Sequence, residues 1–138
     1  MESQTLSKVP TIVIVDDDDL NREAIKTLIR ALRYNVQAFG CAEEYLESGQ
    51  VHNTSCLISD IQMPGMSGGD LQNRLIAGGN QIPIIFMSGL CIEVMRTCVT
   101  ETGVFGFLTK PIDVECLIEC VNRALKNFDS KAAEEGSM

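Results

Sequence analysis

The sequence predicts an α/β domain built on a parallel sheet, and two observations support this fold class. Short apolar runs rich in Val and Ile alternate along the chain with longer segments of helical period. Unusual polar residues follow these runs, as they do at the carboxyl ends of buried strands, where parallel sheets place their ligand sites. We therefore expect five parallel strands with helices on both faces of the sheet.

The first half of the chain supplies three strands and two helices. The run 11–15 is β-branched and reads as a buried strand, and 35–39 and 55–59 are the next two strands. The first helix is expected to bury one apolar face, and a short helix at 42–48 stops at Gly49. That first apolar face comprises Leu20, Ala24, Ile25, Leu28, Ile29 and Leu32.

The second half begins with a loop at 63–66, because Pro64 and Gly65 interrupt regular structure. A helix at 68–76, a strand at 82–87, a helix at 91–101, a strand at 105–108 and a helix at 112–126 follow. The helix at 91–101 contains β-branched residues and is the weakest of the set. The last helix has an apolar face made of Leu117, Ile118, Val121, Ala124 and Leu125.

Length and composition indicate one globular domain. The chain has 138 residues, 45% of them hydrophobic, and a formal net charge of −8, which argues against direct binding to nucleic acid. Neither a membrane span nor a signal peptide is apparent, so we expect a cytoplasmic protein with no membrane partner. We assign 1–9 to a flexible segment, 10–128 to the domain and 129–138 to a polar tail or linker.

The six cysteines show no C-x-x-C pair, and the single histidine, His52, is distant from them in sequence. We expect mostly buried or half-buried thiols rather than a zinc site.

Four consecutive aspartates, 16–19, follow the first expected strand. Asp16 and Asp17 end that strand, Asp60 ends the third, Ser88 the fourth and Lys110 the fifth. A parallel sheet brings these positions to one edge. One ammonium group cannot neutralise three carboxylates, so Mg²⁺, which takes oxygen ligands, is the expected completion of the site.

Each of these residues also has an ordinary structural role to be weighed. An aspartate after a strand is often a turn residue or a helix N-cap, and we assign that role to Asp18 and Asp19, which precede the first helix. The joint occurrence of the other residues at one edge favours a binding site.

Four segments resemble the receiver domain of two-component response regulators, closest to the FixJ/NarL-like subgroup, whose receivers often precede a helix-turn-helix DNA-binding domain. The resemblance covers about residues 10–127 and implies a flavodoxin-like (βα)5 fold with strand order 2-1-3-4-5. The segments are IVIVDDD (12–18), LISDIQMPGMSG (57–68), PIIFMSG (83–89) and GVFGFLTKP (103–111).

The resemblance also implies a role for each matching residue. Asp60 would accept the phosphoryl group, with Mg²⁺, or Mn²⁺ in its place, held by Asp16, Asp17, Asp60 and the backbone carbonyl of Gln62. Ser88 and Lys110 would bind the phosphoryl group, Phe107 would be the switch aromatic, and Lys110–Pro111 would be a cis peptide bond. Gln62 and Leu90 would tune the phosphoryl lifetime.

The function implied is phosphorelay signalling rather than enzymatic turnover of a substrate. A sensor histidine kinase, a phosphotransfer protein or a small phosphodonor would phosphorylate Asp60, and autodephosphorylation would follow. Phosphorylation would draw Ser88 toward the phosphoryl group, turn Phe107 inward and reshape the face of the fourth helix, fifth strand and last helix. That face would control an output partner, transcription regulation included, or a homodimer.

Three rival functions remain on the sequence. An aspartyl-phosphate phosphatase would need a second Asp where Gln62 stands, and a nucleotide- or flavin-binding module would not place four aspartates after the first strand. A phosphorylation-independent receiver-like protein-binding module is the main alternative. The chain could be a stand-alone regulator, a natural fragment, or a segment ended after the last helix.

Overall fold

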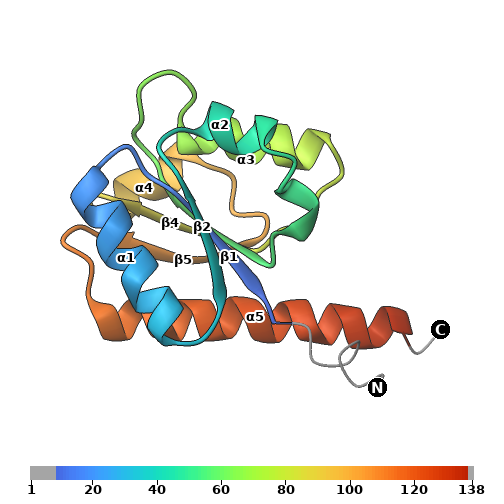
Figure 1. Ribbon diagram of the computed structural model, residues 1–138. Coiled ribbons are helices and arrows are strands. Elements are labelled where there is room, and N and C mark those ends of the chain that lie inside the picture. The colour runs from blue at the N-terminus through green and yellow to red at the C-terminus, as the bar shows by residue number, and fades with distance from the viewer. Residues whose placement is uncertain (1–8, 137–138) are drawn as a thin grey trace.

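The computed structural model describes residues 9–136, with side chains up to residue 126. Within this range a five-stranded parallel sheet has the order β2-β1-β3-β4-β5, which confirms the expected fold and topology (Figure 1). Of the predicted flexible segment 1–9, only Val9 lies inside the described residues. The strands are β1 (Thr11–Val15), β2 (Asn35–Phe39), β3 (Cys56–Asp60), β4 (Ile84–Ser88) and β5 (Val104–Thr109).

Helices cover both faces of this sheet (Figure 1). Side chains of α1 and α5 pack with one set of strand side chains, and those of α2, α3 and α4 pack with the other set. Alternate residues of β1 enter the two cores, with Ile12 and Ile14 in the first and Val13 and Val15 in the second. The helices are α1 (Asp19–Ala31), α2 (Ala42–Glu47), α3 (Gly68–Ala77), α4 (Ile92–Cys98) and α5 (Val114–Gly136), with a 3-10 turn η2 (Val51–Asn53).

Helix α1 begins at the edge of the sheet and is capped by residues at its own N-terminus. Asp18 is the N-cap of α1 and accepts hydrogen bonds from the backbone N–H groups of Leu20 and Asn21. Asp19, in the first turn, pairs with Arg22 at 2.6 Å. The local roles predicted for Asp18 and Asp19 are therefore confirmed.

The predicted apolar face of α1 is only partly correct. Ile25 and Ile29 are buried, but Leu20 is 85% exposed and Ala24 is also exposed. Leu20 sits in the first turn, and Ala24, one turn later, lies on the same solvent-facing side. The apolar face of α5 is confirmed, with Ile118 half-buried.

Three elements, β4, α4 and α5, differ from the prediction by two or more residues at one end or both, and the others by one residue at most. Strand β4 begins at Ile84 rather than 82, after Pro83, which has no N–H for the ladder. Helix α4 ends at Cys98 rather than 101, because Val99 is extended and the Thr100 N–H donates to the Gln72 side chain instead of continuing the helix.

Helix α5 starts later and ends later than predicted. Asp113 accepts hydrogen bonds from the N–H groups of Glu115 and Cys116, so the helix begins at Val114 rather than 112. No Gly or Pro stands between Lys126 and Gly136, and the helix continues through that stretch.

The cysteine expectation is wrong for half of the thiols. Cys56 and Cys120 are buried and Cys41 is half-buried, whereas Cys91, Cys98 and Cys116 are exposed. Within residues 9–136, no helix is long and apolar enough to cross a membrane.

Candidate metal and phosphoryl site

The candidate site lies at the edge of the sheet where the parallel strands end. Asp16 directly follows β1, Asp60 and Ser88 are the last residues of β3 and β4, and Lys110 directly follows β5. Residues up to 94 positions apart in sequence are thereby brought into contact. The sequence-based expectation that these strand ends meet is confirmed.

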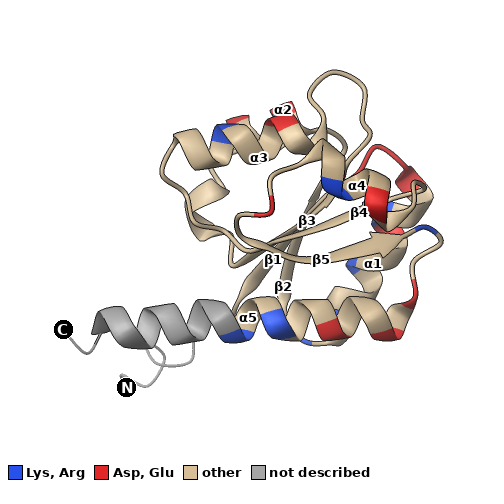
Figure 2. Cartoon of the chain, turned by 180° about the vertical axis from the view of Figure 1, so that it is seen from behind, with Lys and Arg blue, Asp and Glu red and all other residues tan. Residues whose placement is uncertain are grey.

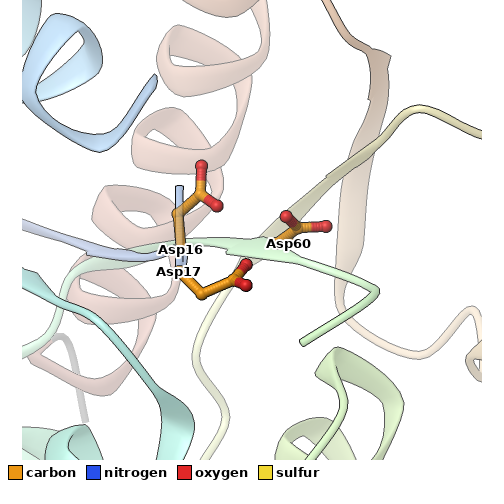
Figure 3. Close-up of side chains that lie close together, drawn as sticks. All are labelled: Asp16, Asp17 and Asp60. Atoms are coloured by element: carbon orange, nitrogen blue, oxygen red, sulfur yellow. The ribbon is translucent and has the colours of Figure 1, made fainter. Parts of the chain in front are cut away.

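Three carboxylates form the centre of the site. Asp16, Asp17 and Asp60 each offer an oxygen within 4.8 Å of the others, and Figure 3 shows the side chains gathered where β1 and β3 end. Asp16 and Asp60 are buried, whereas Asp17 is exposed. Like charges this close disfavour one another unless a cation is added, and an all-oxygen donor set of this kind fits a hard divalent cation such as Mg²⁺.

Lys110 is the cationic partner of the two buried carboxylates. Its Nζ lies 2.8 Å from Asp60 Oδ2 and 3.3 Å from each oxygen of Asp16. Burial alone would lower the pKa of Lys110, but the hydrogen bond and charge of Asp60, together with Asp16, raise it above the usual value. Lys110 is therefore protonated and is shared between two carboxylates.

Asp60 is held by two donors. Besides Lys110, the backbone N–H of Gln62 donates to Asp60 Oδ1 at 3.1 Å. Burial raises the pKa of Asp60 above its usual value, and Lys110 and the Gln62 N–H only partly oppose this rise. A carboxylate that is desolvated and more basic than usual is a better nucleophile than an exposed one.

Asp16 is held more firmly, and chiefly by α1. Its Oδ1 accepts from the Asp18 N–H at 3.0 Å, its Oδ2 accepts from Asn21 Nδ2 at 2.6 Å, and its backbone carbonyl accepts from Arg22 Nη1 at 2.8 Å. Asn21 and Arg22 are not among the site residues predicted from the sequence. The available signal was an Asn one helical turn before the buried Ile25, a polar residue at an apolar position.

The remaining predicted site residues lie around this cluster. The Ser88 hydroxyl is buried and accepts from the Leu90 N–H at 3.1 Å. The Gln62 side chain is exposed and Leu90 is half-buried. The Lys110–Pro111 peptide bond is cis, as the resemblance implied.

Phe107 does not join the carboxylate cluster. It is half-buried on β5, its ring stacks on Phe86 with centroids 6.3 Å apart, and the Arg96 guanidinium of α4 lies 5.1 Å from the ring centroid. The Phe107 ring thus contacts the Phe86 ring of β4 and the Arg96 guanidinium of α4.

Charge is unevenly distributed over the described residues. Acidic residues gather on α2, beside the start of α1 and along the first part of α5, whereas Lys and Arg are scattered over the helices (Figure 2). In this view they form no continuous basic stripe, in keeping with the net charge of −8.

Comparison with known families agrees with this geometry. Residues 12–122 match the family model described as the response regulator receiver domain. The chain belongs to this family. It is a receiver domain of two-component response regulators, and such domains act in phosphoacceptor signalling and generally bind Mg²⁺ through acidic residues.

Several transcriptional and response regulators are similar to this receiver domain. Response regulator protein TmoT of Ectopseudomonas mendocina is 40% identical over 115 residues, which cover 83% of the chain and 52% of TmoT. TodT of Pseudomonas putida is 38% identical over 119 residues, covering 86% and 52%. The receiver domain therefore spans about half the length of these relatives.

Solved structures give the same result. Response regulator StyR superimposes with a TM-score of 0.85 at 32% identity, covering 94% of this chain and 66% of that one. The FixJ-N crystal structure superimposes with a TM-score of 0.76 at 26% identity, covering 87% and 96%. The likeness to FixJ, and to curated FixJ proteins among the relatives, agrees with the subgroup expected from sequence.

Proposed function

We propose that Asp60 is the phosphoacceptor of this receiver domain. The observation that carries the proposal is the environment of the Asp60 side chain, which is buried at the end of β3. It contacts the Lys110 ammonium at 2.8 Å and lies against Asp16 and Asp17. No other carboxylate in the described site combines burial, a cationic partner and so few fixed hydrogen bonds.

The chemistry is a phosphoryl transfer to a carboxylate. An Asp60 oxygen attacks phosphorus, the bond between phosphorus and the donor's leaving atom breaks, and the leaving group departs with that bonding pair. Asp60 must be ionised for this attack, and the protonated Lys110 favours the ionised form. Lys110 then pairs with the phosphoryl oxygens, which carry more charge than the carboxylate did.

Asp16, Asp17, Asp60 and the Gln62 backbone carbonyl are the proposed holders of Mg²⁺, with Mn²⁺ as a substitute. When bound, the metal offsets the negative charge of the transferred group. The chain's own part is to hold the Asp16 carboxylate in a fixed orientation close to Asp17 and Asp60. Later hydrolysis of the acyl phosphate would return the domain to its starting state, at a rate tuned by Gln62 and Leu90, which border the site.

Signal output is proposed to run through Ser88 and Phe107. The Ser88 Oγ accepts one described hydrogen bond, from the Leu90 N–H, and its own O–H can turn to donate to a phosphoryl oxygen. Phe107 is half-buried and would turn into the space that Ser88 leaves, releasing its contact with Arg96. The face of α4, β5 and α5 would thereby change shape, which gives the two states different contacts.

The partners follow from this role. A sensor histidine kinase, a phosphotransfer protein or a small phosphodonor would supply the phosphoryl group, and an output partner or a second copy would bind the α4-β5-α5 face. Transcription regulation is the output that FixJ, a transcriptional regulatory protein, suggests. We place the domain at 10–128, with 129–138, in which α5 continues to Gly136, as tail or linker, and the protein in the cytoplasm.

Intact-mass spectrometry of the chain with acetyl phosphate, with and without Mg²⁺, tests the proposal. We expect one phosphoryl adduct that requires Mg²⁺ and is abolished by Asp60→Asn. Asp19→Asn is the matched control, because Asp19 lies in the same aspartate run but its side chain is 83% exposed and pairs only with Arg22 in the described structure.

A folded wild-type chain that gains no adduct under these conditions would contradict the proposal. That result would favour the alternative, a receiver-like module that binds its partner without phosphorylation. An adduct that survives Asp60→Asn would place the acceptor at another residue.

A further inference from the structure

Asn21 occupies a position where α1 would ordinarily present an apolar residue. Asn21, Ile25 and Ile29 are spaced by four residues and lie along the side of α1 that faces the sheet, with Ile25 and Ile29 buried. Asn21 is half-buried, and even partial burial of a polar amide on such a stripe is unfavourable unless the amide is hydrogen-bonded. Its partners therefore indicate why an amide is there.

The amide nitrogen of Asn21 bridges two strands at the site. It donates to Asp16 Oδ2, beyond β1, at 2.6 Å and lies 3.6 Å from the sulfur of Met87 on β4. Asp16 is fully buried, and its other oxygen accepts from the Asp18 N–H at 3.0 Å. Each oxygen of Asp16 thus has one short hydrogen bond from a neutral donor.

Lys110 holds Asp16 less closely than these neutral donors do. Its Nζ lies 3.3 Å from both Asp16 oxygens but 2.8 Å from Asp60. A lysine that moves to a phosphoryl group on Asp60 would leave Asp16 to Asn21 and Asp18. A neutral donor can fix a carboxylate without cancelling the negative charge that a metal ion requires.

We propose that Asn21 is a positioning residue that holds the Asp16 carboxylate in place for Mg²⁺. The inference rests on the proposed function, because it assumes that Asp16 is a metal-binding carboxylate. Asn21 itself touches no metal or phosphoryl group. It acts by fixing the orientation of Asp16, so its removal affects metal affinity more than the phosphoryl transfer step.

Calorimetric titration with Mg²⁺ alone, on the purified chain without phosphodonor, tests this role. Asn21→Leu keeps the size and the apolar stripe but removes the donor, and we expect the Mg²⁺ dissociation constant to rise about tenfold. Asn73→Leu is the matched control, because Asn73 is exposed on α3 and outside the site. It should leave the dissociation constant unchanged.

Phosphorylation kinetics separate positioning from general damage. In Asn21→Leu, the Mg²⁺ concentration that gives half the maximal rate with acetyl phosphate should rise by the same factor. The rate at saturating Mg²⁺ should stay within about twofold of wild type, because the transfer step does not use Asn21. A structural defect would instead lower the saturating rate.

Unchanged Mg²⁺ affinity in folded Asn21→Leu, or a fall confined to the saturating rate, would overturn the inference while Asp60 remains the phosphoacceptor. If circular dichroism shows Asn21→Leu to be unfolded, Asn21→Ala is subjected to the same titration and the same criteria. A wild-type chain that neither binds Mg²⁺ nor gains a phosphoryl group would overturn the proposed function and this inference together.

Discussion

The two sides of the site are built differently. On the β1–α1 side, Asp16 is fully buried and receives hydrogen bonds on both carboxylate oxygens and on its backbone carbonyl from α1 and its cap. On the β4–β5 side, the Ser88 hydroxyl has one described hydrogen bond, and Phe107 is half-buried beneath a cation of α4. The β1–α1 side is therefore fixed by several short polar contacts, whereas few polar contacts hold the Ser88 and Phe107 side chains on the β4–β5 side.

The helices next to these two sides differ in the same way. α1 is a 13-residue helix with a side-chain N-cap, whereas α4 has seven residues and its N-cap, Cys91, makes no capping hydrogen bond. A metal-holding carboxylate must keep one geometry, and a switch must have two. The division between a fixed and a loosely held side is therefore what phosphoacceptor signalling requires.

Replacing Asp16 by Asn should produce the largest loss of stability among the variants considered. Asp16→Asn offers one acceptor oxygen where the Asp18 N–H and Asn21 Nδ2 both donate, so one of these half-buried hydrogen bonds is lost at a fully buried side chain. We expect the free energy of unfolding to fall by about 2 kcal/mol in urea denaturation with EDTA present.

Asp60→Asn is the informative comparison for this variant. Asp60 receives one neutral hydrogen bond, from the Gln62 N–H, which the Asn oxygen can still accept, and Lys110 keeps Asp16 as its partner. The free energy of unfolding should therefore fall less in Asp60→Asn than in Asp16→Asn. Equal losses at the two positions would contradict the idea that Asp16 is the more firmly held carboxylate.

On the loosely held side, Gln72 of α3 makes the main polar contacts to the segment between α4 and β5. Its buried amide donates to the carbonyls of Thr100 and Thr102 at 2.7 and 3.2 Å and accepts from the Thr100 N–H at 2.9 Å. Gly69, one turn earlier, lets α3 approach closely, because a Cβ there would collide with the Cys98 carbonyl. α3 therefore holds the end of α4.

Gln72→Leu should release this segment at a moderate cost. We expect the free energy of unfolding to fall by about 1 kcal/mol, because water can replace hydrogen bonds to the exposed Thr100. Hydrogen exchange followed by mass spectrometry should quicken at 98–103 and stay unchanged in α1. Asn73→Leu, on the exposed side of the same helix, should leave both regions unchanged, and a uniform effect of Gln72→Leu would argue against a local clamp.

The sequence was sufficient for the fold and for the residues at strand ends. Alternation of apolar runs and helical segments predicted the sheet, and its parallel topology predicted that Asp16, Asp17, Asp60 and Lys110 would meet. Those positions are defined by the backbone alone. A residue that ends a buried strand stands at the edge whatever its side chain contacts.

The sequence was not sufficient where a contact depends on side-chain geometry between elements. Asn21 donates to Asp16 because α1 leaves the edge at a particular angle, which no local pattern specifies. Gln72 meets Thr100 across 28 residues, and this long-range bond ends α4 earlier than propensity predicts. The exposed Leu20 shows the same limit, because periodicity alone does not tell which of two neighbouring stripes of α1 faces the sheet.

The switch residue should show the smallest effect on stability and still a complete effect on signalling. Ser88→Ala removes the acceptor of the Leu90 N–H, which is close to the surface, so we expect a loss of about 0.5 kcal/mol. The phosphoryl adduct should still form on Asp60. Its consequence for α4 and β5, measured as the change in their hydrogen exchange after treatment with acetyl phosphate and Mg²⁺, should be absent.

Ser88→Thr is the matched control, because it keeps the hydroxyl and should preserve the change in exchange. Since Ser88 contributes little to the resting structure, loss of the response in Ser88→Ala with normal stability would separate signalling from folding. If the phosphorylated Ser88→Ala chain showed the wild-type change in α4 and β5, the hydroxyl would not couple the two sides. Coupling would then have to pass through Lys110, which spans the site from β5 to the firmly held Asp16.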